Sequence, residues 1–447
     1  MARLLADITP LRESANYRRL WAGQALANIG AMLTTTAVSL QVYDLTESSW
    51  AVGLLGGFAL APVVLMGLYG GALVDAHDRR KVALAASCVM WLATFGIVVQ
   101  AYLGLNAVWA LYVLVAVQAG ATSVSSPARA AIIPRLVPLE QLPAANALGT
   151  MTFSFATLCG PLLGAVLVAS VGYGPTYLID AVTFTAALYA LLRLPPMPPL
   201  PPLPPGAAGV AGVAGAGAGQ AAAAAQRPTG WRSVAVGLRF LATRRNLLMT
   251  FLTDMCAMIL AFPRAAFPAI AAVILGGGKT TVGLLSACLA FGTIAAMVLS
   301  GPVGRVRRQG LGVVVSVALW GGSIALTGLA LVLAGRSHPA HIIWWALAGA
   351  GLGLAAAGAA DAVSAVFRGT ILQSATPDHL RGRLQGVFIV VVTGGPRMGD
   401  MVMGAGSHWL GEGWAILAGG LACAAAVCLL SRWHPAFLKY DARHPLP

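Results

Sequence analysis

The feature that most constrains this chain is a series of twelve apolar runs separated by short polar breaks. A helix needs roughly 20 apolar residues to cross the hydrocarbon layer of a membrane. The runs cover residues 20–42, 50–73, 81–103, 107–128, 146–170, 174–194, 247–275, 281–302, 311–334, 342–367, 384–409 and 413–431. The sequence therefore predicts an all-α membrane protein with twelve transmembrane helices.

The composition excludes other classes of protein. Hydrophobic residues make up 58% of the chain and charged residues only 9%, against about 25% charged residues in soluble domains. The apolar character extends over the whole chain, which excludes a soluble enzyme, a disordered chain and a single-span anchored protein. The six cysteines all lie inside apolar runs. No spacing of Cys or His fits a metal site, so we expect neither disulfides, nor a metal, nor a cofactor.

Lysine and arginine are distributed unevenly between the loops that join these runs. With the N-terminus on the inner side, 24 of the 28 basic residues fall in inner segments, and only Lys279 and Arg336 fall in outer loops. Cytoplasmic loops of membrane proteins collect Lys and Arg, so we expect both termini to be cytoplasmic. The net charge of +14 then reflects membrane topology, and its spread along the chain argues against nucleic acid as a partner.

The chain divides into two halves joined by a linker. The expected parts are a first six-helix bundle over 1–194, a Pro/Gly/Ala-rich linker over 195–230 and a second bundle over 231–447. The second bundle should begin with a basic amphipathic helix over 231–245 on the inner surface. The proline run 195–205 predicts an extended spacer, with docking of a partner protein as the alternative. The segment from Arg129 to Pro138 aligns without gaps with that from Arg368 to Pro377, as expected of a transporter built from two repeats.

The loop after the second run carries the most specific motif. The matching positions are Gly71, Leu73, Asp75, Arg79, Arg80 and Lys81. They resemble the signature loop of the major facilitator superfamily, although Ala76 and Asp78 replace its usual arginine and glycine. The resemblance implies two pseudo-symmetric six-helix bundles. A carboxylate at Asp75 can also approach the positive N-terminus of a helix in the other half. We therefore expect this loop, with Gly71, Asp75, Arg79, Arg80 and Lys81, to act as a conformational switch that favours the outward-facing state.

A finer resemblance lies in the second half. The stretches from Asp254 to Pro268, from Asp361 to Arg383 and from Gly394 to Asp400 resemble bacterial siderophore exporters of the enterobactin-exporter type. These belong to a drug:proton antiporter branch. The resemblance implies export of a small organic molecule, driven by protons through alternating access. Open alternatives are a multidrug or antibiotic efflux antiporter, a non-transporting membrane sensor or scaffold, and an importer.

Charged residues inside the apolar runs indicate a functional or structural role, because a charge at the bilayer centre costs about 2.5–3.5 kcal/mol. Asp254 and Asp361 are our expected proton carriers; structural pairing of Asp361 with Arg368 is the alternative. Arg264, between Pro263 and Pro268, either binds an anionic substrate or forms a structural ion pair. Structural or coupling roles are expected for Asp180, Arg368, Arg397 and Asp400, with Arg397 and Asp400 neutralising each other at three residues' spacing.

Neutral polar residues complete the expected site. Gln24 and Asn28 lie four residues apart on one helix face, and Gln118 lies in the fourth run. These side chains either bind substrate or join helices by hydrogen bonds. The expected partners are a small-molecule substrate, protons and the lipid bilayer, and we expect a monomer.

Overall fold

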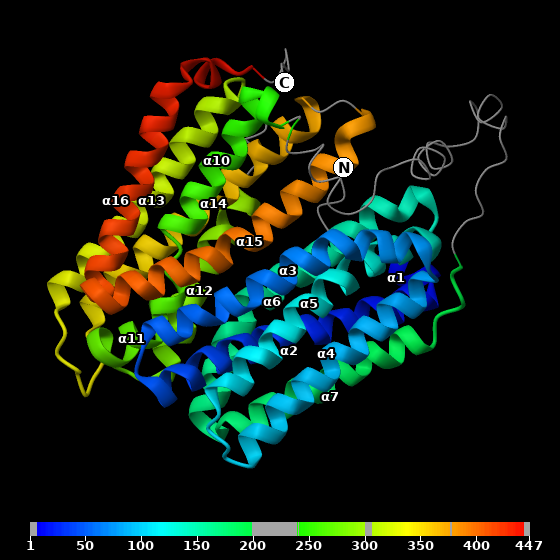
Figure 1. The fold of residues 1–447 in the computed structure, drawn as a ribbon, viewed down its shortest axis with the longest axis horizontal. Helices are drawn as coiled ribbons and strands as arrows, with labels where there is room; N and C mark the ends of the chain where they lie inside the picture. The colour runs from blue at the N-terminus through cyan, green and yellow to red at the C-terminus, as the bar shows by residue number, and fades with distance from the viewer. Residues whose placement is uncertain (1–6, 199–238, 240, 300–305, 376–377, 442–447) are drawn as a thin grey trace.

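The computed structural model describes residues 7–198, 239, 241–299, 306–375 and 378–441, which are almost entirely helical (Figure 1). Within this part, the side chains of residues 68, 71–72, 75–76, 373, 375 and 378–390 lie outside the description. Eleven of the described helices are long and apolar enough to cross a membrane by length and composition. With the long helix α15 (Asp378–Leu410), the twelve expected runs each have a helical counterpart.

The helices form two bundles of six. After the short α1 (Thr9–Glu13), the first bundle contains α2 (Ala15–Thr46), α3 (Ser49–Ala76), α4 (Arg79–Tyr102), α5 (Val108–Ile132), α6 (Leu142–Val171) and α7 (Tyr173–Leu192). The second contains α10 (Arg245–Leu260) with its continuation, α12 (Lys279–Val298), α13 (Gln309–Ala334), α14 (Trp344–Ala375), α15 and α16 (Glu412–Trp433). The fold is therefore the expected all-α major facilitator arrangement.

The helix boundaries follow from local chemistry. Ser14 caps α2 by accepting a hydrogen bond from the Tyr17 backbone N–H, and Ser48 caps α3 in the same way for Ala51. Gly172, with φ of +84°, gives the left-handed turn between α6 and α7 that other residues rarely adopt. Short loops of this kind force consecutive helices to run antiparallel.

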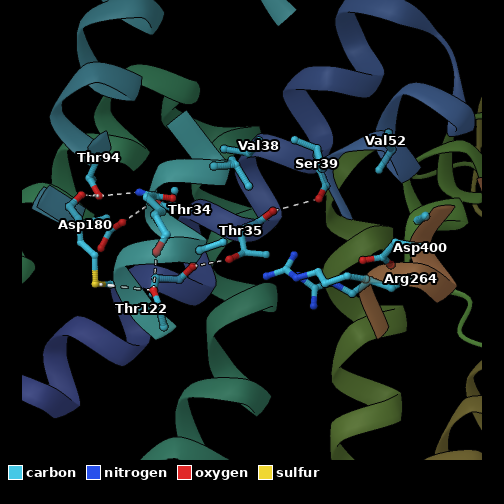
Figure 2. A pocket seen from close by; sticks show the side chains of 18 of the residues that line it. Thr34, Thr35, Val38, Ser39, Val52, Thr94, Thr122, Asp180, Arg264 and Asp400 are labelled. Carbon is cyan, nitrogen blue, oxygen red and sulfur yellow. Dashed lines mark hydrogen bonds between the residues drawn. The ribbon is translucent and has the colours of Figure 1, made fainter. Parts of the chain in front are cut away.

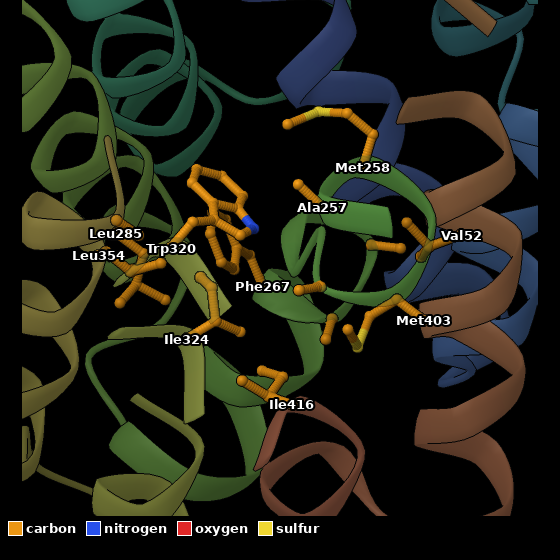
Figure 3. Close-up of a cluster of buried hydrophobic side chains, with 14 of the residues drawn as sticks. Val52, Ala257, Met258, Phe267, Leu285, Trp320, Ile324, Leu354, Met403 and Ile416 are labelled. Atoms are coloured by element: carbon orange, nitrogen blue, oxygen red, sulfur yellow. The ribbon is translucent and has the colours of Figure 1, made fainter. Parts of the chain in front are cut away.

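The seventh span is not one continuous α-helix. The helix α10 ends at Leu260, and the chain continues through a 3₁₀ turn (η5, Arg264–Ala266), α11 (Phe267–Ala269) and a π-helix (η6, Ile270–Leu275). Pro263 explains the break, because it lacks the N–H that an α-helix needs and clashes with the preceding turn. Phe267 packs beside Trp320 and Ile324, so a large hydrophobic core fixes the broken segment (Figure 3).

The two bundles contact each other near the end of the molecule opposite α1 and η8 (Pro435–Lys439), here called the distal end. An added Cβ on Gly56 of α3 would lie 2.5 Å from the Arg397 carbonyl oxygen of α15. An added Cβ on Gly283 of α12 would lie 2.9 Å from the Leu162 Cα of α6. Glycine is needed at both positions because the helix backbones approach so closely.

The same helix faces are uncovered toward the end where α1 and η8 lie, here called the terminal end. Phe155 lies seven residues before Leu162 on one face of α6 and is 56% exposed. Phe291 lies eight residues after Gly283 on α12 and is 62% exposed. In Figure 1 the two bundles accordingly lie close together at the lower left and spread apart toward the upper right. The structure is therefore closed between the bundles at the distal end.

The linker lies largely outside the described residues. Residues 199–230, and the predicted amphipathic helix over 231–245 as far as residue 238, are not described. The first linker residues return to the first bundle, where the Met197 N–H donates to Asp78 Oδ2 at 2.9 Å.

Candidate functional site

A polar cavity of about 130 Å³ lies between the bundles at the distal end (Figure 2). Its walls come from α2, α3, α4, α5 and α7 of the first bundle and from η5 and α15 of the second. The ionisable residues on these walls are Asp180, Arg264, Arg397 and Asp400. A site enclosed by both bundles changes whenever the bundles move relative to each other, as expected for a transport site.

The first bundle contributes oxygen-rich side chains to this cavity. Asp180 on α7 is 2% exposed, and its Oδ2 accepts a hydrogen bond of 2.5 Å from the Thr34 hydroxyl on α2. Its second oxygen has no hydrogen-bond partner in the part of the chain that the structure describes. Gln118, an expected substrate ligand, also lines the cavity and donates to the Thr94 hydroxyl at 2.8 Å.

The second bundle contributes the cations. Arg264 lies in η5, directly after the break at Pro263, so its side chain extends toward the first bundle (Figure 2). Arg397 and Asp400 line the same cavity from α15. No ion pair shorter than 4 Å joins the described side chains of Arg397 and Asp400, and Asp400 Oδ1 has no hydrogen-bond partner.

Asp400 nevertheless interacts electrostatically with Arg397, and also with Arg264 of η5 as a second cation. Gly56 of α3 packs against the Arg397 carbonyl oxygen and the Asp400 Cβ. The expectation that Arg397 and Asp400 neutralise each other stays a prediction.

A second charged cluster lies nearer the terminal end of the second bundle. Arg368 on α14 forms an ion pair with Asp254 on α10, and its Nη2 lies 3.4 Å from Asp361 Oδ1. The side chains of Arg368 and Asp254 are 8% and 6% exposed, whereas that of Asp361 is 34% exposed. Asp254 lies within α10 and Arg264 lies beyond the break that follows it, so the two charged layers lie at different depths of the span.

A related cluster in the first bundle was not expected from the sequence. Arg129 on α5 donates to Gln24 Oε1 on α2 and, at 2.8 Å, to the Ser87 hydroxyl on α4. Gln24 in turn donates to Asn28 Oδ1 at 2.8 Å. The sequence placed Arg129 just after its helix, but α5 continues to Ile132, because Arg129 is held by hydrogen bonds to α2 and α4 and so can remain within the helix. The alignment of Arg129 with Arg368 was the signal that could have identified it.

The signature loop makes its described contacts within the first bundle. Arg79 donates to the Ala131 carbonyl at 3.1 Å, and Arg80 donates to the Leu191 and Leu192 carbonyls. Asp78 accepts from the Arg80 and Lys81 N–H groups and so caps α4, a stabilising role that the family's usual glycine lacks. The side chains of Gly71 and Asp75 lie outside the description, so the expected contact of Asp75 with the other half stays a prediction.

Two six-helix bundles that enclose a charged cavity within the membrane define a membrane transporter. The chain belongs to the transmembrane secretion effector family (MFS_3), whose model matches residues 5–443. It is 26% identical over 404 residues to the enterobactin exporter EntS of Salmonella typhi, covering 90% of this chain and 87% of that protein. The enterobactin exporter EntS of Citrobacter koseri is also 26% identical, with the same coverage.

Solved structures of transporters share the fold. The POT family transporter PepTSo matches with a TM-score of 0.71 and 14% identity, over 95% of this chain and 99% of that one. A bacterial homologue of the iron transporter ferroportin in an inward-facing state matches with a TM-score of 0.62 and 15% identity, over 95% and 98%. The protein is thus an integral inner-membrane transporter of an exporter family and not an enzyme.

Proposed function

We propose that this protein exports a small organic molecule across the inner membrane by proton antiport and alternating access. The proposal rests on one observation: Arg368 contacts two carboxylates that differ in their distance from it and in their exposure. Asp254 is buried against the guanidinium, whereas Asp361 lies 3.4 Å away and is one-third exposed. One cation between two acids leaves one negative charge, which a proton can neutralise.

The proton would be carried by Asp361. With the termini in the cytoplasm, the terminal end faces the cytoplasm, and an exposed Asp361 there can release its proton. The ionised acid then attracts Arg368, and substrate enters the space between the bundles. After the bundles reorient, a proton from outside neutralises Asp361 and weakens its hold on Arg368. Each cycle moves a proton inward and a substrate outward.

The cavity chemistry suits an amphipathic substrate that bears polar oxygen groups. Arg264 and Arg397 together bring two cations near the one carboxylate of Asp400, while Met90, Phe184 and Leu55 supply apolar contacts. Because the relatives at 26% identity are named enterobactin exporters, a siderophore-like molecule is our first choice. A broad multidrug exporter is the second, since apolar side chains also line the walls.

The test uses purified protein in liposomes with an imposed pH gradient. A catecholate siderophore and a hydrophobic cationic dye are offered in parallel, and substrate-driven proton movement is recorded. Proton movement with the siderophore alone supports a dedicated siderophore exporter. Movement with the dye supports a multidrug antiporter. The absence of movement with both compounds contradicts proton antiport of these substrate classes.

Contacts between the bundles at the distal end should stabilise the state described here, with its closed side toward the exterior. Lys279 Nζ of the second bundle lies 2.7 Å from Asp44 Oδ2 of the first. It also lies 4.4 Å from the ring centroid of Tyr173, whose hydroxyl donates to Asp44. On the other side, the Ser49 hydroxyl lies 3.4 Å from Glu412 Oε1.

Replacing Lys279 with glutamine is expected to raise the population that is open to the outside. Exposed ion pairs contribute about 0.2–1 kcal/mol, which corresponds to a shift of roughly 1.4- to 5-fold. Spin labels at the distal ends of α2 and α12 would report the change as a longer-distance peak. Arg336→Gln, at a weaker contact of 3.7 Å to Glu412 within one bundle, is the matched control. An unchanged distance distribution in Lys279→Gln would contradict a role in closure.

A further inference from the structure

The two charged clusters near the terminal end occupy equivalent positions in the two halves. Gln24 is the tenth residue of α2 and Asp254 is the tenth residue of α10. Thr122 precedes Arg129 by seven residues on α5, as Asp361 precedes Arg368 on α14. The arginines bind the equivalent helices, α2 and α10. Each half therefore holds one arginine at the same place.

The surroundings of the two arginines differ in charge. Arg368 lies beside the carboxylates of Asp254 and Asp361. At the equivalent places, Arg129 has Gln24, which is neutral, and Thr122, whose hydroxyl donates instead to the Gln118 carbonyl at 2.7 Å. No carboxylate lies within 4 Å of Arg129 among the described residues. The cluster in the first half thus keeps a full positive charge within the membrane, where an unneutralised charge is costly.

The Arg129 cluster presents N–H donors that make no bond to a described residue. The Gln24 amide holds the cluster together, since its oxygen accepts from Arg129 and its nitrogen donates to Asn28. Arg129 Nε is buried and has no hydrogen-bond partner among the described residues. Within the same part of the chain, the Asn28 side chain makes one hydrogen bond, through its oxygen, which leaves its amide nitrogen available as a donor. A positive charge with free N–H donors favours the binding of a ligand that has an anionic oxygen.

We propose that Arg129, Gln24 and Asn28 form a binding site for the carboxylate or phenolate group of an organic anion entering from the terminal side. The inference rests on the proposed export function and deepens it, since it assigns a different role to each half. The first half holds the anionic group of the substrate, and the second half handles the proton. Gln24 lies ten residues before Thr34 on α2, about 15 Å along the helix, so the site adjoins the distal cavity on its terminal side and would receive the substrate first.

The test measures equilibrium binding to the purified full-length protein in a non-ionic detergent, with salicylate as the anionic probe and salicylamide as its neutral analogue. The unmodified protein should bind salicylate more tightly. Arg129→Gln should weaken salicylate binding by about tenfold or more, the effect of losing a charge-assisted hydrogen bond, and leave salicylamide binding unchanged. Arg193→Gln removes an exposed positive charge at the end of α7 and should leave both affinities unchanged.

A second pair of variants tests the charge argument with Arg129 still present. Gln24→Asp gives the first half the acid that the second half carries at Asp254, and should abolish the preference for salicylate over salicylamide. Gln24→Asn shortens the side chain equally without adding charge, so the preference should survive. Equal salicylate affinity in Gln24→Asp and Gln24→Asn would overturn the proposal, as would unchanged binding in Arg129→Gln.

This binding experiment requires neither a pH gradient nor transport. Loss of anion preference in Arg129→Gln would support the site even if liposome assays showed no proton movement. Proton-coupled export combined with salicylate binding that ignores Arg129 would overturn the site and leave the proposed export function standing.

Discussion

Replacement of Asp361 with asparagine is expected to abolish substrate-driven proton movement while leaving the protein folded in the membrane. Asp361 is the more exposed of the two acids that share Arg368, so protons reach it most directly. Asparagine has nearly the same shape but no ionisable group, and it leaves Arg368 balanced by Asp254 alone. The variant should therefore still exchange substrate down a concentration gradient without moving protons.

The measurement compares two assays on the same liposome preparation. Proton uptake upon addition of substrate should fall to the level of empty liposomes, whereas counterflow of labelled substrate should persist. Asp361→Glu, which keeps the acid, should restore proton movement and serves as the matched control. Proton movement at the unmodified rate in Asp361→Asn would remove Asp361 from the carrier role.

Replacement of Arg368 with glutamine is expected to be the most destabilising single change near the site. Arg368 is 8% exposed in its side chain and is the described cation that contacts Asp254, which is 6% exposed. Breaking a buried pair by removing one partner costs about 3–5 kcal/mol, since the remaining charge is left without compensation. We expect lower yields from the membrane and a lower apparent melting temperature in detergent.

The double variant Arg368→Gln with Asp254→Asn separates charge from packing. It removes the stranded carboxylate as well as the arginine, so stability should recover in part. A single variant as stable as the unmodified protein would show that Asp254 and Arg368 contribute little to each other's burial. A double variant no more stable than the single one would place the loss in the packing of the long arginine side chain.

Much of the fold was predictable because it depends on local chemistry. The apolar runs of about 20 residues fix the spans, since a helix must satisfy its own backbone hydrogen bonds in lipid. The family resemblance was confirmed by a family model that covers residues 5–443. Helix ends were less predictable: α14 continues to Ala375, eight residues past its apolar run, because hydrogen bonding along the backbone does not end where hydrophobicity ends.

The sequence also identified most ionisable residues of the candidate site, because a charge in an apolar run stands out against its neighbours. It could not say which charges meet. The spacing of Arg397 and Asp400 suggested that they interact, but it gave no sign that Arg264 lies near the same carboxylate and that all three line one cavity. Arg129 was overlooked because it lies close to the inner basic segments, where arginine is common.

The sequence by itself determined that this chain spans the membrane many times, that it consists of two related halves, and which side chains bring charge into the bilayer. The length of the apolar runs, the internal repeat and the residue types can all be read directly from the sequence. The tertiary structure alone decided the partners of those charges: Arg368 between two acids, Arg129 among neutral side chains, and Asp180 bound by the Thr34 hydroxyl. These partners lie up to 146 residues apart in the chain, and only helix packing sets the distances on which electrostatic interaction depends.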